Sequence, residues 1–192
     1  MEILPEIEQR ISPYVFKSDE VEPEKVKALV EAARLAPSCF NNQEWNYIFV
    51  HKDDPQRNQF ENAFSLGNEW AIRAPILVAV ASNPSQDCKT NGLPYYAYDA
   101  GLSVMSLVIE AEHQGLRVHQ MAGYNEENVK KALMIPEGYR VIVLFAVGYE
   151  GEIKGILDAL TDKVKNRLTR ARTRKPVSDN FFKDRFGERL NF

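Results

Sequence analysis

The sequence contains few cysteines and few histidines, and this scarcity argues against several kinds of site. Its 192 residues include two cysteines, Cys39 and Cys88, which lack CxxC spacing, and three histidines. Such sparse cysteine is atypical of a disulfide framework or a zinc ribbon and favours a cytosolic protein. His113 and His119 are near metal-ligand spacing, but they straddle a predicted helix end, so we expect no metal site.

The short motifs of several enzyme classes are also absent. The sequence contains no GxxxxGK[ST] phosphate loop, no GxGxxG turn after a strand, no GxSxG elbow and no HExxH. It offers no evident pair of nucleophile and base, so we expect no catalytic side chain. This absence favours a protein whose chemistry is supplied by a cofactor.

Long hydrophobic runs and a strong net charge are absent as well. The apolar runs "APILVAVA" and "VIVLFAV" are less than half as long as a membrane span. The first ten residues carry acids where a signal peptide would need basic residues. The formal charge is −3, and 44% of the residues are hydrophobic. We therefore expect a single cytoplasmic domain over residues 1–192 that binds neither membranes nor nucleic acid.

One segment is strongly basic. Residues 163–175, "KVKNRLTRARTRK", contain seven basic residues and no acidic ones. Such a segment is either a solvated helix face followed by a tail, or an anion site. RNA binding has little support, because the segment contains no aromatic side chain that could stack on bases.

Hydrophobic periodicity predicts a mixture of helices and strands. Apolar residues at positions 26, 29, 30 and 33 share one face of a helix that begins near Pro23 and ends before Pro37. Asp99 and Gly115 are the expected N-cap and stop of a longer, buried helix. The other predicted elements are strands over 45–51, 76–82, 116–120 and 140–149, a loop over 83–94, and helices over 98–115 and 125–134, the last with Asn125 as its cap.

Polar residues gather between the first of these helices and the first strand, in "PSCFNNQ" (37–43). Near a core, a polar group without a partner costs about 1–3 kcal/mol. Ser38, Asn41 and Gln43 therefore either cap the ends of the two elements or face a polar ligand.

Five sequence blocks resemble, in order, the motifs of the nitroreductase family, the FMN-dependent NAD(P)H oxidoreductases. Residues 36–45, "APSCFNNQEW", resemble APSxxNxQPW, and residues 10–16, "RISPYVF", resemble RxSxRxF. Residues 68–78 resemble NxxWxxxAPxLV, residues 99–138 resemble GLxxHxMxGF followed by IPEG, and residues 172–182 resemble the closing RxRKPL. The likeness covers nearly the whole chain.

The resemblance implies a fold and an activity. The fold would be α+β, with a mainly antiparallel central sheet flanked by helices, in an intertwined homodimer whose apolar segment 176–192 packs on the partner subunit. The activity would be that of an FMN-dependent oxidoreductase that passes a hydride from NAD(P)H to an oxidised acceptor, such as a nitroaromatic or a quinone, in a ping-pong cycle. An FMN-storing or FMN-sensing protein with little turnover is the alternative. The sequence identifies neither the acceptor nor a preference for NADH or NADPH.

The resemblance also implies a set of cofactor and substrate contacts. Arg10, Ser12, Arg172 and Arg174 match phosphate-binding positions, where guanidinium groups form strong charge-assisted hydrogen bonds. Pro37, Ser38 and Cys39 would follow the ribityl chain, Asn41 and Gln43 the ring, Asn68 the flavin or its phosphate, Ala122 and Gly123 the flavin N5 atom, and Tyr95 and Tyr96 the substrate pocket. Plain packing is the alternative for Cys39 and the tyrosines, a simple turn for Gly123, and caps and turns for residues 37–43.

Two positions depart from the family pattern. Tyr14 stands where the family usually has Arg or Lys, so one phosphate cation is missing. Glu44 replaces the proline of QPW, and we expect its charge to face solvent. Both departures agree with the alternative of a binding protein with little turnover.

Overall fold

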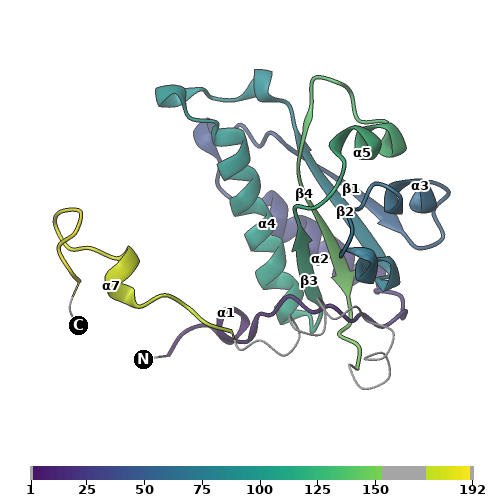
Figure 1. Ribbon diagram of the computed structural model, residues 1–192, viewed down its shortest axis with the longest axis horizontal. Coiled ribbons are helices and arrows are strands. Elements are labelled where there is room, and N and C mark those ends of the chain that lie inside the picture. Colours follow the sequence, from purple (N-terminus) through teal and green to yellow (C-terminus); the bar gives the residue numbers. More distant parts are fainter. Residues whose placement is uncertain (1, 153–171, 191–192) are drawn as a thin grey trace.

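The computed structural model describes residues 2–152 and 172–190, and its centre is one antiparallel sheet (Figure 1). The strands are β1 (Trp45–His51), β2 (Ile76–Ser82), β3 (Arg117–Met121) and β4 (Arg140–Gly148), in the order β1-β2-β4-β3. All three neighbouring pairs are antiparallel. The predicted strands are confirmed, with ends within one or two residues of those expected.

The two central strands are buried because they carry apolar side chains on both faces. Every residue of β2 is buried, and successive side chains of a strand point to opposite faces of a sheet. Ile76, Val78 and Val80 belong to one hydrophobic cluster, whereas Leu77 and Ala79 belong to the other. The sheet therefore separates two cores, one on each face.

Helices cover both faces. α2 (Pro23–Arg34) and α4 (Tyr95–His113) pack against the first face. α3 (Arg57–Glu61), η2 (Glu69–Arg73) and α5 (Glu126–Leu133) lie against the other face (Figure 1). The Tyr47 hydroxyl on β1 lies 2.8 Å from Ser103 Oγ on α4, and Ser103 donates to Ala33 O on α2 at 2.9 Å. Burial raises the pKa of Tyr47 to about 12, so this link stays neutral.

α4 begins earlier than the sequence indicates. The helix starts at Tyr95, after Pro94, so the prediction of Asp99 as its N-cap is wrong. Asp99 lies within the helix, is 1% exposed and accepts a hydrogen bond from Cys39 N at 2.8 Å. The Asp99 carboxylate, which the local sequence assigned to a helix cap, therefore forms a tertiary contact with Cys39. The predicted stop is confirmed, because Gly115 follows the helix with φ +74°.

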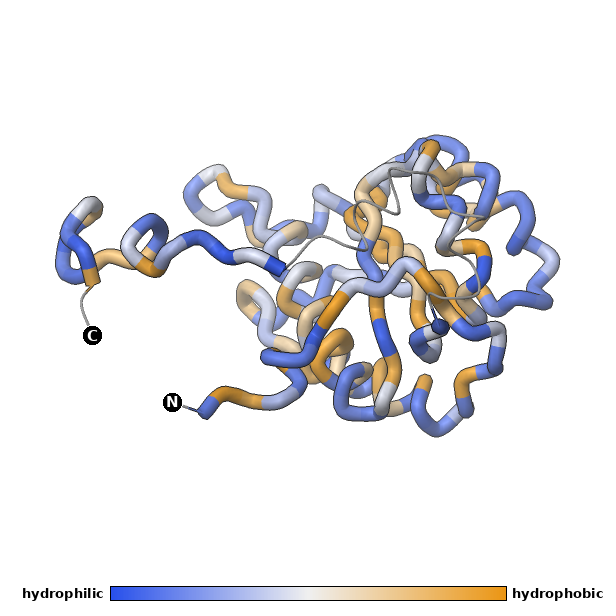
Figure 2. The backbone as a smooth tube through the Cα atoms, turned by 60° about the horizontal axis from the view of Figure 1, so that its bottom comes forward, coloured by the Kyte–Doolittle hydropathy of each residue, from blue (hydrophilic) through white to orange (hydrophobic). Residues whose placement is uncertain are grey.

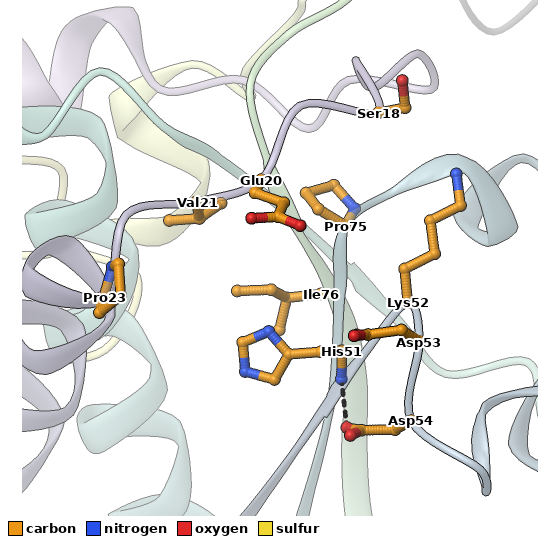
Figure 3. A pocket seen from close by; sticks show the side chains of 10 residues that line it. All are labelled: Ser18, Glu20, Val21, Pro23, His51, Lys52, Asp53, Asp54, Pro75 and Ile76. Atoms are coloured by element: carbon orange, nitrogen blue, oxygen red, sulfur yellow. Dashed lines mark hydrogen bonds between the residues drawn. The ribbon is translucent and has the colours of Figure 1, made fainter.

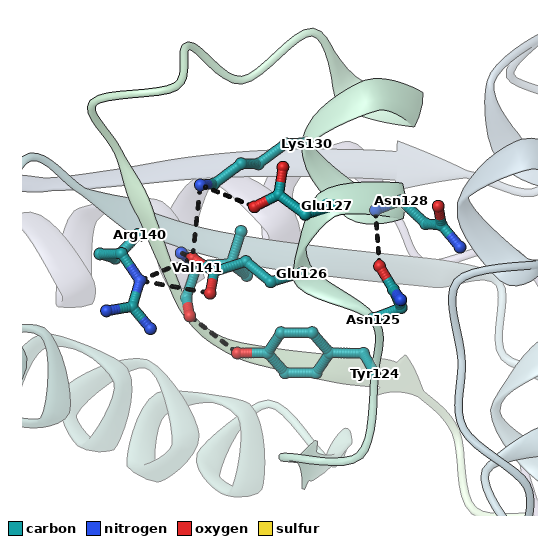
Figure 4. A network of polar contacts seen from close by, with 8 residues as sticks. All are labelled: Tyr124, Asn125, Glu126, Glu127, Asn128, Lys130, Arg140 and Val141. Carbon is teal, nitrogen blue, oxygen red and sulfur yellow. Dashed lines mark hydrogen bonds and ion pairs between the residues drawn. The ribbon is translucent and has the colours of Figure 1, made fainter.

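A polar network attaches α5 to the start of β4 (Figure 4). Glu126 Oε1 accepts from both Arg140 Nε and Val141 N at 2.9 Å. Burial opposes ionisation of Glu126, but these hydrogen bonds outweigh it and lower its pKa. Asn125 Oδ1 accepts from Asn128 N at 2.9 Å, which confirms Asn125 as the helix cap.

The two ends of the chain leave the sheet on the same side. α1 (Pro5–Gln9) precedes the first motif, and residues 172–190, which include α7 (Val177–Asn180), extend away from the domain (Figures 1 and 2). This extended segment carries apolar side chains, and Phe186 is 95% exposed. Within the described residues, no helix has the length and apolarity that crossing a bilayer requires.

The remaining helices are short 3₁₀ turns that join the main elements. η1 (Cys39–Asn41) lies between α2 and β1, and η3 (Pro84–Gln86) and η4 (Thr90–Gly92) lie between β2 and α4. The predicted loop over 83–94 thus contains two such turns. Most of the basic segment 163–175 lies outside the described residues, apart from positions 172–175.

Candidate functional site

The predicted phosphate contacts come together near the C-terminal end of α4. Arg10 Nη1 donates to Ser12 Oγ at 3.2 Å. Arg172 Nη1 donates to two carbonyls of the N-terminal segment, Glu8 O at 2.7 Å and Arg10 O at 3.1 Å. These contacts join residues more than 160 positions apart in the sequence. The structure therefore brings the first and last family motifs to one place.

The arginines of this group repel one another. The pKa of Arg10 is lowered, first by burial and then by the charges of Arg172 and Arg174, while Glu112 opposes the shift. No carboxylate within the described chain forms an ion pair with Arg10, Arg172 or Arg174. A concentration of guanidinium groups without paired carboxylates is the electrostatic arrangement that an anion would stabilise.

Glu112 lies beside this group and is already engaged. Its Oε2 accepts from Arg117 Nη1 at 2.7 Å, and its side chain is 3% exposed. Burial raises the pKa of Glu112, and Arg117 and Arg10 oppose the increase. Arg117 forms the ion pair with Glu112, while the charge of Glu112 offsets only part of the repulsion among the other arginines.

Tyr14 belongs to an aromatic cluster and supplies no cation. Its ring meets Trp70 and His119 edge-on, with centroids 5.3 Å and 4.6 Å away. Trp70 and His119 stack on each other at 4.1 Å, and His119 Nδ1 lies 2.8 Å from Pro13 O. The cluster holds the segment with the Arg10 group against β3.

Asn68 and Gly123 are in direct contact. Asn68 Nδ2 donates to Gly123 O at 2.8 Å, and Ser65 N donates to the same oxygen at 3.0 Å. A Cβ at position 123 would lie 2.9 Å from Asn68 Nδ2, which is closer than side-chain atoms can approach. A side chain at position 123 would therefore displace the Asn68 side chain. The neighbouring Ala122 is exposed.

The predicted ring contacts form a second group at the other end of α4. We call residues 36–43 the amide corner. Gln43 N donates to Ser38 Oγ at 3.0 Å, and Gln43 Nε2 donates to Asn41 O at 3.1 Å. Asn41, Gln43 and Pro37 are exposed. Within one chain, Ser38 closes a turn, while the Asn41 and Gln43 side chains remain at the surface, where a ligand can reach them.

The loop 83–94 packs on the amide corner and positions the two tyrosines. Asn42 Nδ2 donates to Gln86 O at 2.8 Å, and Tyr96 N donates to Asp87 Oδ1 at 3.1 Å. Tyr95 and Tyr96 form the first turn of α4, and both are half-buried. They therefore lie beside the amide corner, at the border predicted for a substrate pocket.

The two groups are far apart in a single chain. The amide corner contacts Asp99, and the arginine group lies beside Glu112, thirteen residues further along α4. At 1.5 Å per residue, these positions are separated by about 20 Å. One chain does not bring the predicted residues together as one site.

The two cysteines are joined, contrary to the expectation from their number. Cys39 and Cys88 form a disulfide with their Cα atoms 6.3 Å apart. The sequence argued against disulfides because a framework needs several bridges, but a single bridge between two loops needs no such pattern. Plain packing, the alternative to a ribityl contact for Cys39, is therefore wrong.

Glu44 does not face solvent, which overturns the expectation from the sequence. Its side chain is 5% exposed, and neither carboxylate oxygen has a hydrogen-bond partner within the described part of the chain. Burial raises the pKa of Glu44, and the nearby carboxylates of Asp99 and Asp87 add to the increase. The position that the family fills with proline therefore buries an acid behind the amide corner.

A cavity of about 540 Å³ lies elsewhere, at the end of β1 (Figure 3). The sequence predicted no site here, and the cavity is lined by Ser18, Glu20, Val21, Pro23, His51, Lys52, Asp53, Asp54, Pro75 and Ile76. His51 N donates to Asp54 Oδ2 at 2.6 Å, which closes the turn after the strand. Among the described residues, no cluster of His, Cys, Asp or Glu has the arrangement of a metal site.

Several functional candidates escaped the sequence-based prediction. Cys88 and Asp99 both contact Cys39 in the amide corner. Glu112 and His119 lie beside the Arg10 segment. Asp99 gave a local signal, because it is an acid inside an apolar helical pattern. Cys88 gave none, since its partner is 49 residues away.

The sequence matches the nitroreductase family over residues 7–67 and 55–149. These stretches cover more than half of the chain, and they contain the amide corner, Asn68 and Gly123. The chain therefore belongs to the nitroreductase family, and its α+β fold is the one predicted.

Individual relatives are similar over most of the chain. A 15.4 kDa uncharacterised protein of Mycolicibacterium smegmatis is 32% identical over 124 residues, which are 65% of this chain and 80% of that protein. An oxygen-insensitive NADPH nitroreductase of Helicobacter acinonychis is 27% identical over 150 residues, which are 77% of this chain and 68% of that protein. A crystal structure of an oxidoreductase containing FMN superposes with a TM-score of 0.84 at 27% identity, over 98% of this chain and 95% of that one.

The buried Glu44 predicts a pH dependence of stability. Since its pKa in the folded protein lies above the ordinary value of 4.5, the folded chain binds more protons than the unfolded chain between the two values. Protonated Glu44 contributes to the stability of the folded protein. This contribution is fully present below the ordinary pKa and is lost as the pH rises through the raised pKa. Glu44→Gln should therefore gain stability relative to wild type over the pH range that begins at the ordinary value and ends at the raised one.

Urea unfolding of the two apoproteins across this range measures the difference. Glu127→Gln, at an exposed glutamate, is the matched control and should follow wild type. A Glu44→Gln curve that runs parallel to wild type at every pH contradicts the burial of a costly charge.

Proposed function

We propose that this chain is an FMN-dependent oxidoreductase that takes a hydride from NAD(P)H and reduces a small oxidised acceptor such as a quinone or a nitroaromatic. The observation that carries the proposal is the unpaired arginine group of Arg10, Arg172 and Arg174. Membership of the nitroreductase family supports it, as do the relatives named for NADPH-dependent nitroreduction and for FMN. When bound, FMN supplies hydride transfer, and donor and acceptor use one pocket in turn in a ping-pong cycle.

The arginine group fits the phosphate of FMN. A phosphate dianion accepts charge-assisted hydrogen bonds from guanidinium groups, and Ser12 adds a hydroxyl donor. Binding of the anion would relieve the repulsion that lowers the pKa of Arg10. Tyr14 adds no charge, so the three arginines supply the attraction.

The amide corner fits the pyrimidine edge of the flavin. This edge alternates carbonyl acceptors with an N–H donor, and the amides of Asn41 and Gln43 each carry both a donor and an acceptor. Ala122 and Gly123 would approach N5 through a backbone N–H, in the place that Asn68 fixes by its hydrogen bond to Gly123 O. These residues orient the ring, while Tyr95 and Tyr96 border the space above it.

A two-fold dimer would unite the two groups of residues. If two α4 helices pair in opposite directions, the amide corner of one chain meets the arginine group of the other, and two equivalent sites form. The exposed apolar tail supports this assembly, since Phe181 is 58% exposed and Phe186 is 95% exposed in the single chain. The tail would pack on the partner subunit.

The alternative, a protein that stores or senses FMN, gains support from Tyr14, which supplies no cation for the phosphate. The two functions differ in one measurement. Under anaerobic conditions, the purified yellow protein should lose its absorbance near 450 nm, the flavin band, when NADH or NADPH is added. Slow or absent bleaching with both nucleotides would favour storage.

The arginine group predicts selectivity for the phosphate. Arg10→Ala and Arg172→Ala should each weaken FMN binding by about tenfold to a hundredfold, since a hydrogen bond to a charged group contributes about 1.5–3 kcal/mol. Binding of riboflavin, which has the same ring and no phosphate, should change little. Titration by quenching of flavin fluorescence measures both constants.

Arg34→Ala is the control, because Arg34 is exposed on α2 and pairs with Glu31. Equal losses for FMN and riboflavin would show that these arginines serve the fold and not the phosphate.

The proposed dimer predicts complementation between two defective chains. One chain carries Arg10→Ala with Arg172→Ala, and the other carries Asn41→Ala with Gln43→Ala. If each site combines the arginine group of one chain with the amide corner of the other, a mixed dimer contains one intact site and one doubly defective site. FMN titration of co-expressed, doubly tagged mixed dimers should therefore recover one high-affinity site per dimer. Mixed dimers with no high-affinity site would place each complete site within one chain.

A further inference from the structure

The disulfide Cys39–Cys88 connects the amide corner to the loop 83–94, which precedes the tyrosines at the border of the proposed substrate pocket. It bridges residues 49 positions apart, one in η1 and the other between η3 and η4. One further bond joins the same two segments, from Asn42 Nδ2 to Gln86 O at 2.8 Å. Both cysteines are only half-buried, so the bridge is not enclosed in the hydrophobic core.

Both linked segments hold non-glycine residues in left-handed backbone conformations. In the amide corner these are Phe40 (φ 51°), Asn41 (φ 59°) and Gln43 (φ 51°), and in the loop they are Lys89 (φ 49°) and Asn91 (φ 57°). Such conformations are unfavourable for residues with a Cβ and persist where the surroundings impose them. A cross-link between the two segments is such a constraint, so its loss should let the amide corner relax.

The surroundings of the two sulfur atoms differ. Cys88 Sγ accepts a hydrogen bond from Thr90 Oγ1 at 3.7 Å. The Asp99 carboxylate lies beside Cys39, whose backbone N donates to Asp99 Oδ2 at 2.8 Å. A hydroxyl donor stabilises a thiolate, whereas a neighbouring carboxylate destabilises it. Cys88 is therefore the better leaving thiolate.

We propose that Cys39–Cys88 is a thiol-exchange site for low-molecular-weight thiols and dithiols, and that its oxidation state sets the affinity of the amide corner for FMN. The second part rests on the proposed function of the corner. The oxidised pair holds the corner in the conformation that receives the flavin ring. The reduced pair releases it.

The exchange balances as two successive displacements. A thiolate of the reductant attacks Cys39 Sγ and forms a mixed disulfide, while the Cys39–Cys88 bond breaks and its electron pair leaves with Cys88 Sγ, which Thr90 Oγ1 stabilises. A second thiolate, from the same dithiol or from a second monothiol molecule, then attacks the sulfur of the reductant in the mixed disulfide, and Cys39 leaves as the thiolate. The reductant loses two electrons and becomes a disulfide, and the two cysteines gain two electrons and two protons.

The site itself can be tested without any flavin. Apoprotein purified without reductant is alkylated and analysed by peptide mass spectrometry, before and after treatment with dithiothreitol. We expect alkylation of both cysteines only after reduction. With limiting glutathione, the mixed disulfide should form on Cys39, and Thr90→Val, which removes the hydroxyl at nearly constant volume, should slow the reaction by several-fold.

Two results would overturn the exchange site. Alkylation of both cysteines in oxidised apoprotein would show that no disulfide forms, and glutathione attached to Cys88 would reverse the assigned direction of attack. Ser85→Ala, which removes a hydroxyl from the same loop without a contact to sulfur, is the matched control and should react at the wild-type rate.

The link to FMN is tested by titration in both oxidation states. Reduced and desalted wild type, kept anaerobic, should bind FMN about tenfold more weakly than the oxidised protein, which is within the usual range of coupling between sites. Cys88→Ser should resemble the reduced wild type and should not respond to dithiothreitol. This variant leaves Cys39 in place, and chemical reduction of wild type provides the same comparison without any mutation.

The outcomes separate this inference from the function on which it rests. Equal FMN affinities in the oxidised protein, the reduced protein and Cys88→Ser would overturn the thiol control while leaving the FMN enzyme intact. Failure of every form to bind FMN would overturn the proposed function.

Discussion

The packing of α4 against α2 and the sheet is the interaction on which the proposed site depends. One side of this nineteen-residue helix is buried, and Ser103 fixes it to α2 through its bond to Ala33 O. Because the helix is rigid, the positions of its two ends determine where the amide corner and the arginine group lie. The distance between the two groups is therefore set by the hydrophobic core, and neither group sets it by its own contacts.

The two ends of α4 differ in charge. The end with Glu112 carries arginines that lack a matching number of carboxylates, and the end with Asp99 buries acids behind the amide corner. An anion gains most at the first end, whereas the second offers neutral donors and acceptors at its surface. FMN has the same division, with a dianionic phosphate at one end and a neutral ring at the other.

Most of the fold could be predicted from the sequence, because its signals are local. Runs of apolar, aromatic and β-branched residues identified the four strands, and Gly115 and Asn125 marked helix ends by their own chemistry. The failures share a cause, which is that a distant partner decided the outcome. Asp99 binds Cys39 instead of capping a helix, Glu44 is covered by elements from elsewhere in the chain, and Cys39 meets Cys88. The contact of Arg172 with the Arg10 segment was accessible only through the family resemblance.

The same arrangement has a consequence for how relatives of this protein can diverge. An insertion or deletion within α4 would rotate its two ends relative to each other by about 100° per residue and would misalign both groups at once. The loop 83–94 is attached to the amide corner through Cys88 and Gln86, so its other positions can change in composition while these two links are kept. Such changes would alter the border of the proposed substrate pocket and leave the attachment of the amide corner in place.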